Sequence, residues 1–257
     1  MKKVLLALTA VAAFTGSAFA ADLPARTYTK APPPVMTPSW TGFYIFGGAG
    51  GGIWDADSHT VAGGVATTID QRMGGDGWFG TVGAGYDWQF NSSWVAGVFA
   101  DGQFGSLRGS MNDNFFGRTG TEKLKDTWAA GVRAGYLVAP NVLSYVNAGY
   151  TGSEWSGATL TSTLGGPAVA TTPSFNRNGW FVGGGVENNL NIFGISAPGW
   201  FMKTEYRAAY FNSITLPETL ASGAPSVDSV TFKPWVQTIS TSLVYRFNWT
   251  GPVVAKY

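Results

Sequence analysis

The chain has 257 residues, of which 36 are glycine, 15% are aromatic and 12% are charged, and it contains no cysteine. Disordered chains are poor in aromatic residues and rich in charge, so this composition excludes disorder, and the lack of cysteine excludes disulfide scaffolds and thiolate sites. The formal net charge of +1 gives no broad basic face for nucleic acid, and the single histidine excludes sites that need two imidazole groups.

Residues 1–20 have the organisation of a secretory signal peptide. Lys2 and Lys3 precede a nearly unbroken apolar run of eleven residues, and the small residues at positions 18 and 20 fit cleavage after residue 20. The run is too short to be a membrane anchor, because a spanning helix needs about 20 apolar residues. Cleavage leaves 14 basic and 15 acidic residues, and no later apolar run approaches spanning length. We therefore expect an exported chain that is either soluble or crosses a membrane as strands.

Residues 21–39 form a proline-rich lead, with prolines at positions 24, 32, 33, 34 and 38. Consecutive prolines lack N–H donors and favour the extended polyproline II conformation. We interpret this segment as a periplasmic spacer outside the fold, with docking of a partner as the alternative.

From residue 40 onward the sequence alternates between two kinds of residue. Within 77–90, Trp78 and Val82 share one parity, while Asp87 and Gln89 share the other. Alternation over this length indicates a strand with a different environment on each face. The facing of the first strand stays open, because its apolar residues occur on both parities. The pattern predicts eight strands, within 41–54, 77–90, 94–104, 127–136, 145–150, 180–187, 200–210 and 238–247.

The connections between these strands alternate in length. Short ones fall at 91–93 and 138–142, with a longer one at 188–199, and extended polar stretches cover 55–76, 106–126, 153–178 and 211–233. Short periplasmic turns and long external loops around an even number of antiparallel strands are typical of outer-membrane barrels. We predict an all-β fold, an eight-stranded antiparallel up-and-down transmembrane β-barrel over residues 40–249, with a C-terminal extension at 250–257.

Large aromatic residues lie at the strand ends on the apolar parity, with small residues between them. Their separations of eight to ten residues correspond to a height of ~25 Å after a strand tilt of ~40°, which matches the apolar band of a membrane barrel. The core of a soluble barrel gives no reason for two such rows. We therefore expect an aromatic girdle that contains Trp78, Trp88, Trp94, Phe104, Trp128, Tyr136, Trp180, Trp200 and Tyr210.

The opposite parity carries four acidic and four basic residues. An Arg or Lys that faces lipid at the bilayer midplane costs ~2–4 kcal/mol, whereas charges in a closed lumen can pair with one another. We therefore place these residues inside the barrel as a plug of ion pairs, with a narrow porin-like channel for small solutes as the alternative. The expected network consists of Asp87, Asp101, Arg133, Glu187, Lys203, Glu205, Arg207 and Arg246.

Several short motifs, taken in order, resemble those of one family. They are Ala21-Asp22-Leu23-Pro24 after the signal, Trp40-Thr41-Gly42-Phe43-Tyr44, Gly183-Gly184-Gly185-Val186-Glu187, Lys203-x-Glu205-Tyr206 and Tyr245-Arg246-Phe247. The chain resembles the alphaproteobacterial outer-membrane immunogenic proteins, porin-family proteins with an OmpA-like β-barrel. The resemblance implies a location in the outer membrane, roles in envelope integrity and surface exposure, and no catalytic residues.

The partners expected for such a barrel follow from its place in the envelope. They are outer-membrane lipids and lipopolysaccharide, the periplasmic chaperones and the barrel assembly machinery. We expect a monomer that has no cofactor, no metal site and no nucleic-acid partner.

An outer-membrane lipid-modifying enzyme is a second alternative. Ser58 and His59 lie in a predicted loop near Asp55 and Asp57, and a hydrolase of this kind needs a serine, a histidine and an orienting acid within reach. We interpret His59 as a solvated loop residue, so the chain is not expected to be an enzyme. The two aspartates lack the spacing of an EF-hand loop. The glycine run at 47–52 indicates close strand packing rather than a phosphate-binding loop.

Overall fold

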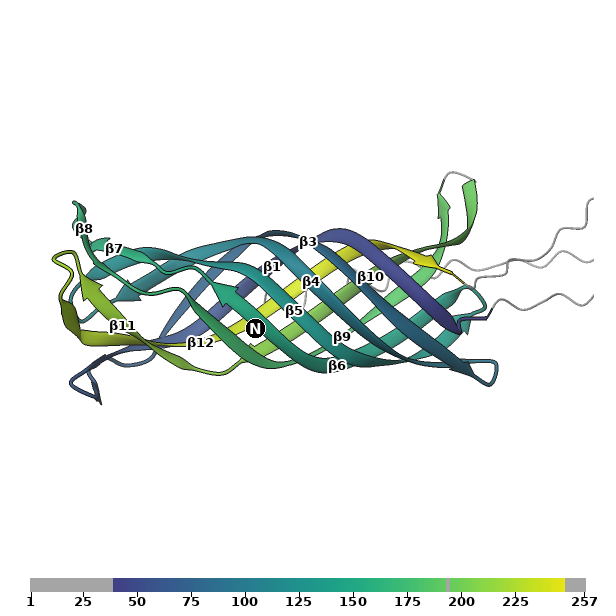
Figure 1. Ribbon diagram of the computed structural model, residues 1–257, viewed down its shortest axis with the longest axis horizontal. Helices are drawn as coiled ribbons and strands as arrows, with labels where there is room; N and C mark the ends of the chain where they lie inside the picture. The colour runs from purple at the N-terminus through teal and green to yellow at the C-terminus, as the bar shows by residue number, and fades with distance from the viewer. Residues whose placement is uncertain (1–38, 193–194, 248–257) are drawn as a thin grey trace, which may run out of the picture. The chain divides into compact units, whose positions relative to one another are not determined.

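The computed structural model describes residues 39–192 and 195–247, so the predicted signal peptide, nearly all of the proline-rich lead and the C-terminal extension lie outside the described residues. The described chain folds as antiparallel β-structure (Figure 1). Within these ranges, no helix is long and apolar enough to cross a membrane. The strands are β1 (Gly42–Ala62), β2 (Val65–Ala66), β3 (Gln71–Phe90), β4 (Trp94–Asp113), β5 (Arg118–Ala139), β6 (Val142–Trp155), β7 (Thr159–Ser162), β8 (Ala168–Thr171), β9 (Phe175–Ile192), β10 (Ile195–Phe211), β11 (Ile214–Leu220) and β12 (Pro225–Arg246).

Eight of the described strands close into a ring, in the order β1-β3-β4-β5-β6-β9-β10-β12, and β12 returns to pair with β1. The closing pair is antiparallel and runs from Tyr44 opposite Arg246 to Ala62 opposite Asp228, which is nearly the whole of β1. Closure pairs the backbone groups of the first and last strands, so this seam has no free edge within lipid. The predicted eight-stranded antiparallel barrel is therefore the observed architecture.

The two faces of each strand lie in different environments. Along β12, Ser242 and Val244 point inward and are buried, whereas Ile239 and Leu243 point outward and are 58% and 48% exposed. Apolar side chains on the outside and polar ones on the inside suit a wall that faces lipid. The period-two pattern in the sequence thus corresponds to the two sides of the barrel wall.

The facing of β1 follows from its two neighbours. Tyr44 and Phe46 point inward and are buried. The glycine-rich part of the strand lies very close to β12, because a Cβ at Gly48 would overlap the backbone at Ser242. Glycine permits this close approach of two backbones, which explains the unusual composition of the strand.

The described strands are longer than the sequence pattern indicated. The stretches predicted to be long polar loops contain the ends of β1, β3, β4, β5, β6, β9 and β12, together with all of β2, β7, β8 and β11. Strands β7, β8 and β11 continue β6, β9 and β10 after short breaks; β7 pairs with β5, and β11 pairs with β12. We call this end of the barrel distal, and the opposite end, where β1 begins, proximal (Figure 1).

The prediction of loops was wrong because the pattern of side chains is reversed on the parts of the strands beyond the membrane. There, polar side chains point outward and apolar ones point inward. On the distal part of β5, the outward Thr121 is exposed, whereas the inward Leu124 is buried. Register shifts between Phe104 and Leu107 on β4 and after Leu124 on β5 also change the parity near this boundary. A strand that faces water and contains a bulge does not match a template for a lipid-facing strand.

Candidate functional site: the charged barrel interior

Four charged side chains form the proximal cluster inside the barrel: Asp87 on β3, Arg133 on β5, Glu187 on β9 and Arg246 on β12. Arg133 donates hydrogen bonds to both acids, through Nε to Asp87 Oδ1 at 2.8 Å and through Nη1 to Glu187 Oε2 at 3.1 Å. Arg246 also reaches both acids, Glu187 Oε1 and Asp87 Oδ2, at 2.8 Å each. Two positive and two negative charges are thus mutually paired in a buried ring of contacts.

The central cluster lies on β4 and β10. Arg207 forms a bidentate pair with Asp101, at 2.9 Å to Oδ1 and 2.7 Å to Oδ2, and also contacts Glu205 Oε1 at 2.8 Å. Lys203 Nζ lies 3.7 Å from Glu205 Oε2, which accepts a hydrogen bond from the Tyr145 hydroxyl at 2.8 Å. The central cluster also contains two cations and two anions, so it is neutral when all four are ionised.

Aromatic rings of the interior cover the cations of both clusters. Because a ring face is negative, it stabilises a cation that has been removed from water. The contacts are Arg133 over Tyr44 at 4.3 Å, Arg246 over Trp40 at 4.3 Å, Lys203 over Phe46 at 3.3 Å and Arg207 over Phe181 at 4.6 Å. The sequence analysis did not predict these contacts. A signal that could have found them is that an inward-facing ring shares its odd or even parity with the inward-facing charged residues of the same strand.

Inward-facing glycines leave the space that the two clusters occupy. Gly97 lies opposite both Asp87 and Arg133 in the sheet register, and a Cβ there would overlap the Asp87 carboxylate. A Cβ at Gly85 would likewise overlap the phenol ring of Tyr44. The glycines of the wall therefore match the large interior side chains.

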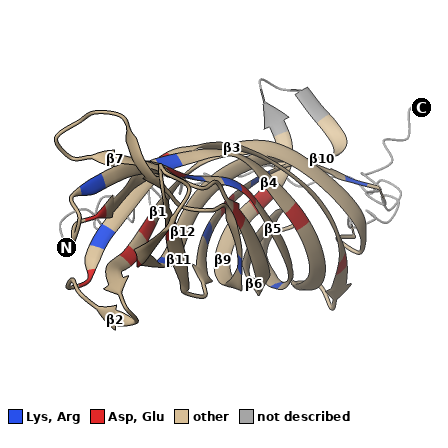
Figure 2. Ribbon diagram, turned by 60° about the vertical axis from the view of Figure 1, so that its left-hand side comes forward, with Lys and Arg blue, Asp and Glu red and all other residues tan. Residues whose placement is uncertain are grey.

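The structure places every residue of the predicted charge network inside the barrel, where all of them are buried. It divides them into the two clusters rather than one continuous chain, since the ion pairs link residues within a cluster. Figure 2 shows the acidic and basic bands on several strands of the wall. Pairing of this kind is what makes buried charge tolerable.

The residues predicted for the aromatic girdle point outward, with exposed fractions from 37% for Tyr210 to 80% for Trp78. Neighbouring rings contact one another around the wall in two rows. In the distal row the ring centroids of Trp180 and Tyr210 are 4.6 Å apart, and in the proximal row those of Trp94 and Tyr136 are 5.2 Å apart. Trp235 continues the distal row and was not predicted. We refer to the wall between the two rows as the spanning section.

Distal to the spanning section, aromatic and aliphatic side chains form a core inside the barrel. Trp54, Trp155, Phe175 and Phe232 pack with ring centroids between 5.2 and 5.8 Å apart. Further buried side chains on the distal parts of the strands include Leu107, Met111, Leu124, Leu160, Leu216 and Val230. This distal core fills the end of the barrel that leads away from the charged clusters.

A small cavity lies at the proximal edge of the distal core. It is lined by Phe79, Leu107 and Leu124, among others, and its volume of about 10 Å³ is roughly the minimum that one water molecule requires.

Glu122 is a charged residue that points into the apolar distal part of the interior. It is completely buried; Oε1 accepts a hydrogen bond from the amide of Lys123 at 3.3 Å, and Oε2 has no hydrogen-bond partner. Burial raises the pKa of Glu122 to about 8. The carboxyl group is therefore mostly protonated at neutral pH, which suits its apolar surroundings.

The residues of the enzyme alternative do not assemble into a catalytic dyad. His59 lies on β1 rather than in a loop, and its Nδ1 is 2.9 Å from Asp70 Oδ1. Ser58 is buried inside the barrel, because consecutive residues of a strand point to opposite faces. Its hydroxyl and the imidazole of His59 are therefore on different sides of the wall.

Residues 6–247 match the family described as "Outer membrane protein beta-barrel domain". The chain belongs to this family. The resemblance drawn from the short motifs is thereby confirmed, and so is the location in the outer membrane. Lipids of that membrane surround this family member, and the outward apolar face of its spanning section fits that environment.

Two relatives of this outer-membrane barrel are the 31 kDa outer-membrane immunogenic proteins of Brucella melitensis and Brucella suis. Each is 33% identical over 222 residues, which cover 80% of this chain and 85% of the relative. They are named as immunogenic membrane proteins, not as enzymes. The crystal structure of OprG from Pseudomonas aeruginosa has the same fold, with a TM-score of 0.54 at 14% identity, over 80% of this chain and 97% of OprG.

Proposed function

We propose that this protein is a closed structural barrel that supports the integrity of the outer membrane and presents its distal end at the cell surface. The observation that supports this most is the proximal cluster. Arg133 and Arg246 each contact both Asp87 and Glu187, so four separate strands are joined across the lumen.

The cluster stabilises the barrel because separating its buried charges costs free energy. Removal of one partner from a buried ion pair costs about 3–5 kcal/mol, since the remaining charge is left buried and unpaired. Both acids of the proximal cluster are completely buried. The same pairing blocks the lumen, because ions cannot pass without displacing charged groups that hold one another.

Closure of the barrel is tested by conductance. The folded protein is inserted into planar bilayers, and insertion is verified by heat-modifiable migration on gels and by protection from protease. We expect no step currents above background. Regular conductance steps from inserted protein would overturn the closed barrel and support the narrow porin-like channel instead.

The envelope role is tested in the native host. Deletion of the gene is expected to increase sensitivity to detergents, and the wild-type gene is expected to restore resistance. Arg133→Leu is expected to restore it poorly, and the matched surface variant Arg108→Leu fully, because Arg108 is exposed and its side chain donates a hydrogen bond to Ser106 on the same strand. Unchanged sensitivity in the deletion strain would contradict the proposed role.

The proposal includes partners suited to this surface. The aromatic rows fit the headgroup levels of a bilayer whose outer leaflet is lipopolysaccharide, and a barrel of this kind requires periplasmic chaperones and the barrel assembly machinery to insert. We propose that it acts as a monomer. Light scattering in detergent checks the monomer: a stable dimer mass at micromolar concentration would contradict it.

A further inference from the structure

A groove lies on the outer face of the barrel, within the spanning section. Its volume is about 710 Å³, inside the range of roughly 300–1,000 Å³ that is typical of pockets for small molecules. The groove crosses β4, β5, β6 and β9, and Trp88 on β3 lies at its edge. Its floor includes the outward side chains of Ala96, Val98, Val132, Ala134, Val146 and Ala148. We call this hollow the wall groove.

The wall groove exists because the outward side chains of these strands are small. Ala96 on β4 lies opposite Ala134 on β5 in the sheet register, and Val132 on β5 lies opposite Ala148 on β6. Strands β1, β10 and β12 carry larger side chains on their outer faces, among them Ile45, Ile53, Trp200, Tyr206, Ile239 and Leu243. This difference in size hollows the wall on the side of β4, β5 and β6.

Aromatic rings border the floor of the groove. Trp94 on β4 and Tyr136 on β5 form the proximal border, two positions from the nearest alanines of the floor. Tyr150 on β6 and Trp180 on β9 lie opposite each other in the register and form the distal border. Trp88 forms a lateral border on β3. Rings in this arrangement limit the sideways movement of an apolar chain that enters the groove.

We propose that the wall groove holds one acyl chain of a phospholipid from the periplasmic leaflet. The groove is continuous with the outer face that borders the membrane lipid, so hydrocarbon chains are what it meets. Its floor begins beside the proximal aromatic row, and the strands of that end are joined by short turns at 91–93 and 140–141. Short turns of such barrels are periplasmic. Neither turn carries a charged side chain, so the acyl chain, rather than the headgroup, is the part that is recognised.

The shape of the groove favours a lipid over a second copy of the protein. A two-fold symmetric contact places the same patch of both copies face to face, so that patch must be complementary to itself. Two hollows that face each other would enclose a void, whose lining loses dispersion contacts. A flexible acyl chain can instead follow the floor between the rings. The inference goes beyond the structural barrel proposed above and does not depend on whether its lumen is closed.

Native mass spectrometry of the full folded chain in mild detergent tests the groove. Heat-modifiable migration first verifies folding, and dipalmitoyl phosphatidylethanolamine is the probe. We expect the wild type to retain one phospholipid per chain. Ala134→Leu and Ala148→Leu each occupy part of the floor and should weaken binding by roughly tenfold, or about 1.4 kcal/mol of binding free energy. The matched control is Ala84→Leu, because Ala84 is exposed on the outer face of β3 and does not line the groove; it should leave binding unchanged.

The masses of the complexes distinguish the alternatives. No retained phospholipid in the wild type, or equal retention in Ala134→Leu and Ala148→Leu, would overturn the site. An equal loss in Ala84→Leu would do so as well, because it would assign the lipid to the wall in general. A dimer mass that disappears in the groove variants would assign the groove to a second copy. Protein extracted from its own outer membrane should carry phospholipid there, and lipid A in its place would contradict the periplasmic leaflet. Conductance steps, which would overturn the closed barrel, would leave these results unaffected.

Discussion

At the scale of single residues, the charges of the proximal cluster are unusual because each has its ion-pair partners on other strands. Arg133, for example, contacts Asp87 on β3, Glu187 on β9 and the ring of Tyr44 on β1. A residue of this kind stabilises the fold only as part of its cluster. Loss of any one charge leaves the others buried without compensation.

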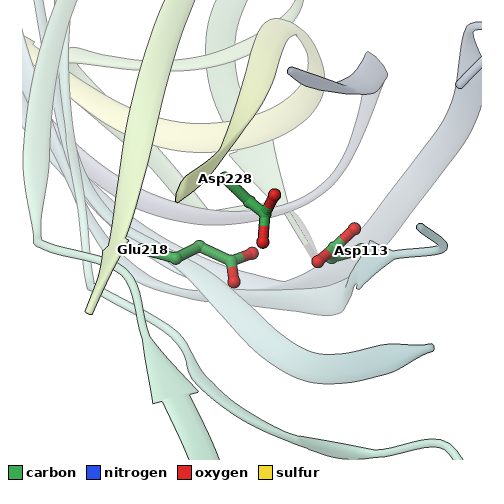
Figure 3. A group of neighbouring side chains, drawn as sticks. All are labelled: Asp113, Glu218 and Asp228. Carbon is green, nitrogen blue, oxygen red and sulfur yellow. The ribbon is translucent and has the colours of Figure 1, made fainter. Parts of the chain in front are cut away.

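Arg133→Leu is expected to lower the free energy of unfolding by about 3–5 kcal/mol, because Asp87 and Glu187 then share only Arg246. The measurement is a urea unfolding midpoint in detergent or lipid vesicles. Arg118, which the sequence places in a loop, is unsuitable as a control, because it begins β5 and forms ion pairs with the buried Asp113, Glu218 and Asp228 (Figure 3). The exposed Arg108→Leu is the better control, with a change within about 0.5 kcal/mol; equal midpoints for the two variants would contradict the network.

The raised pKa of Glu122 predicts that the stability of the barrel depends on pH. Its pKa is raised from 4.5 to about 8 by burial, while the hydrogen bond from the Lys123 amide and the charge of Lys125 lower it only partly. Between these values the folded state keeps a proton that the unfolded state has lost, so stability falls as pH rises toward 8. Glu122→Gln keeps the neutral form at every pH. The difference in unfolding midpoint between pH 6 and pH 9 should therefore shrink in this variant; an unchanged difference would show that Glu122 does not titrate there.

At the scale of elements, the strand β5 passes through two environments, the lipid of the membrane and the water beyond it. On β5, the outward Val132 is 60% exposed between the aromatic rows, whereas the outward Thr121 lies distal to Trp128. The outer side of the same strand therefore faces lipid at one place and water at another. The interior inverts in the same way, from ion pairs in the spanning section to the aromatic distal core.

This boundary predicts that introducing an arginine on the outer side of β5 has a large effect at one position and a small effect at another. Val132→Arg is expected to cost ~2–4 kcal/mol, because the guanidinium would face the hydrocarbon of the bilayer. Thr121→Arg should change stability by no more than about 0.5 kcal/mol, because the side chain faces water. Unfolding in lipid vesicles gives both values. Similar costs for both variants would place the boundary elsewhere on β5.

At the scale of the whole barrel, stability comes from closure of the wall and from filling of the lumen. The long β1–β12 seam completes the wall. The proximal cluster, the central cluster and the distal core then fill the lumen in succession along it. A wall of eight strands has an interior just wide enough for its own side chains, so filling it requires the glycines opposite the large residues. The stability of the barrel and the filling of its lumen thus have the same structural cause.

The sequence by itself determined the strand alternation, the two aromatic rows and the inward placement of the charges, because each of these repeats every second residue along a single strand. It also carried the family resemblance. Only the tertiary structure decided which acid meets which base, since Asp87 and Arg246 are 159 residues apart in the chain.

The meeting of three acidic side chains at the distal end and the facing of β1 were likewise decided only by the tertiary structure. Asp113, Glu218 and Asp228 come together only because β4, β11 and β12 meet at the distal end. Tyr44 points inward because both neighbours of β1 fix its register. Local periodicity reports the environment of one strand, whereas contacts across a lumen depend on how all the strands close, and that information is distributed over the whole chain.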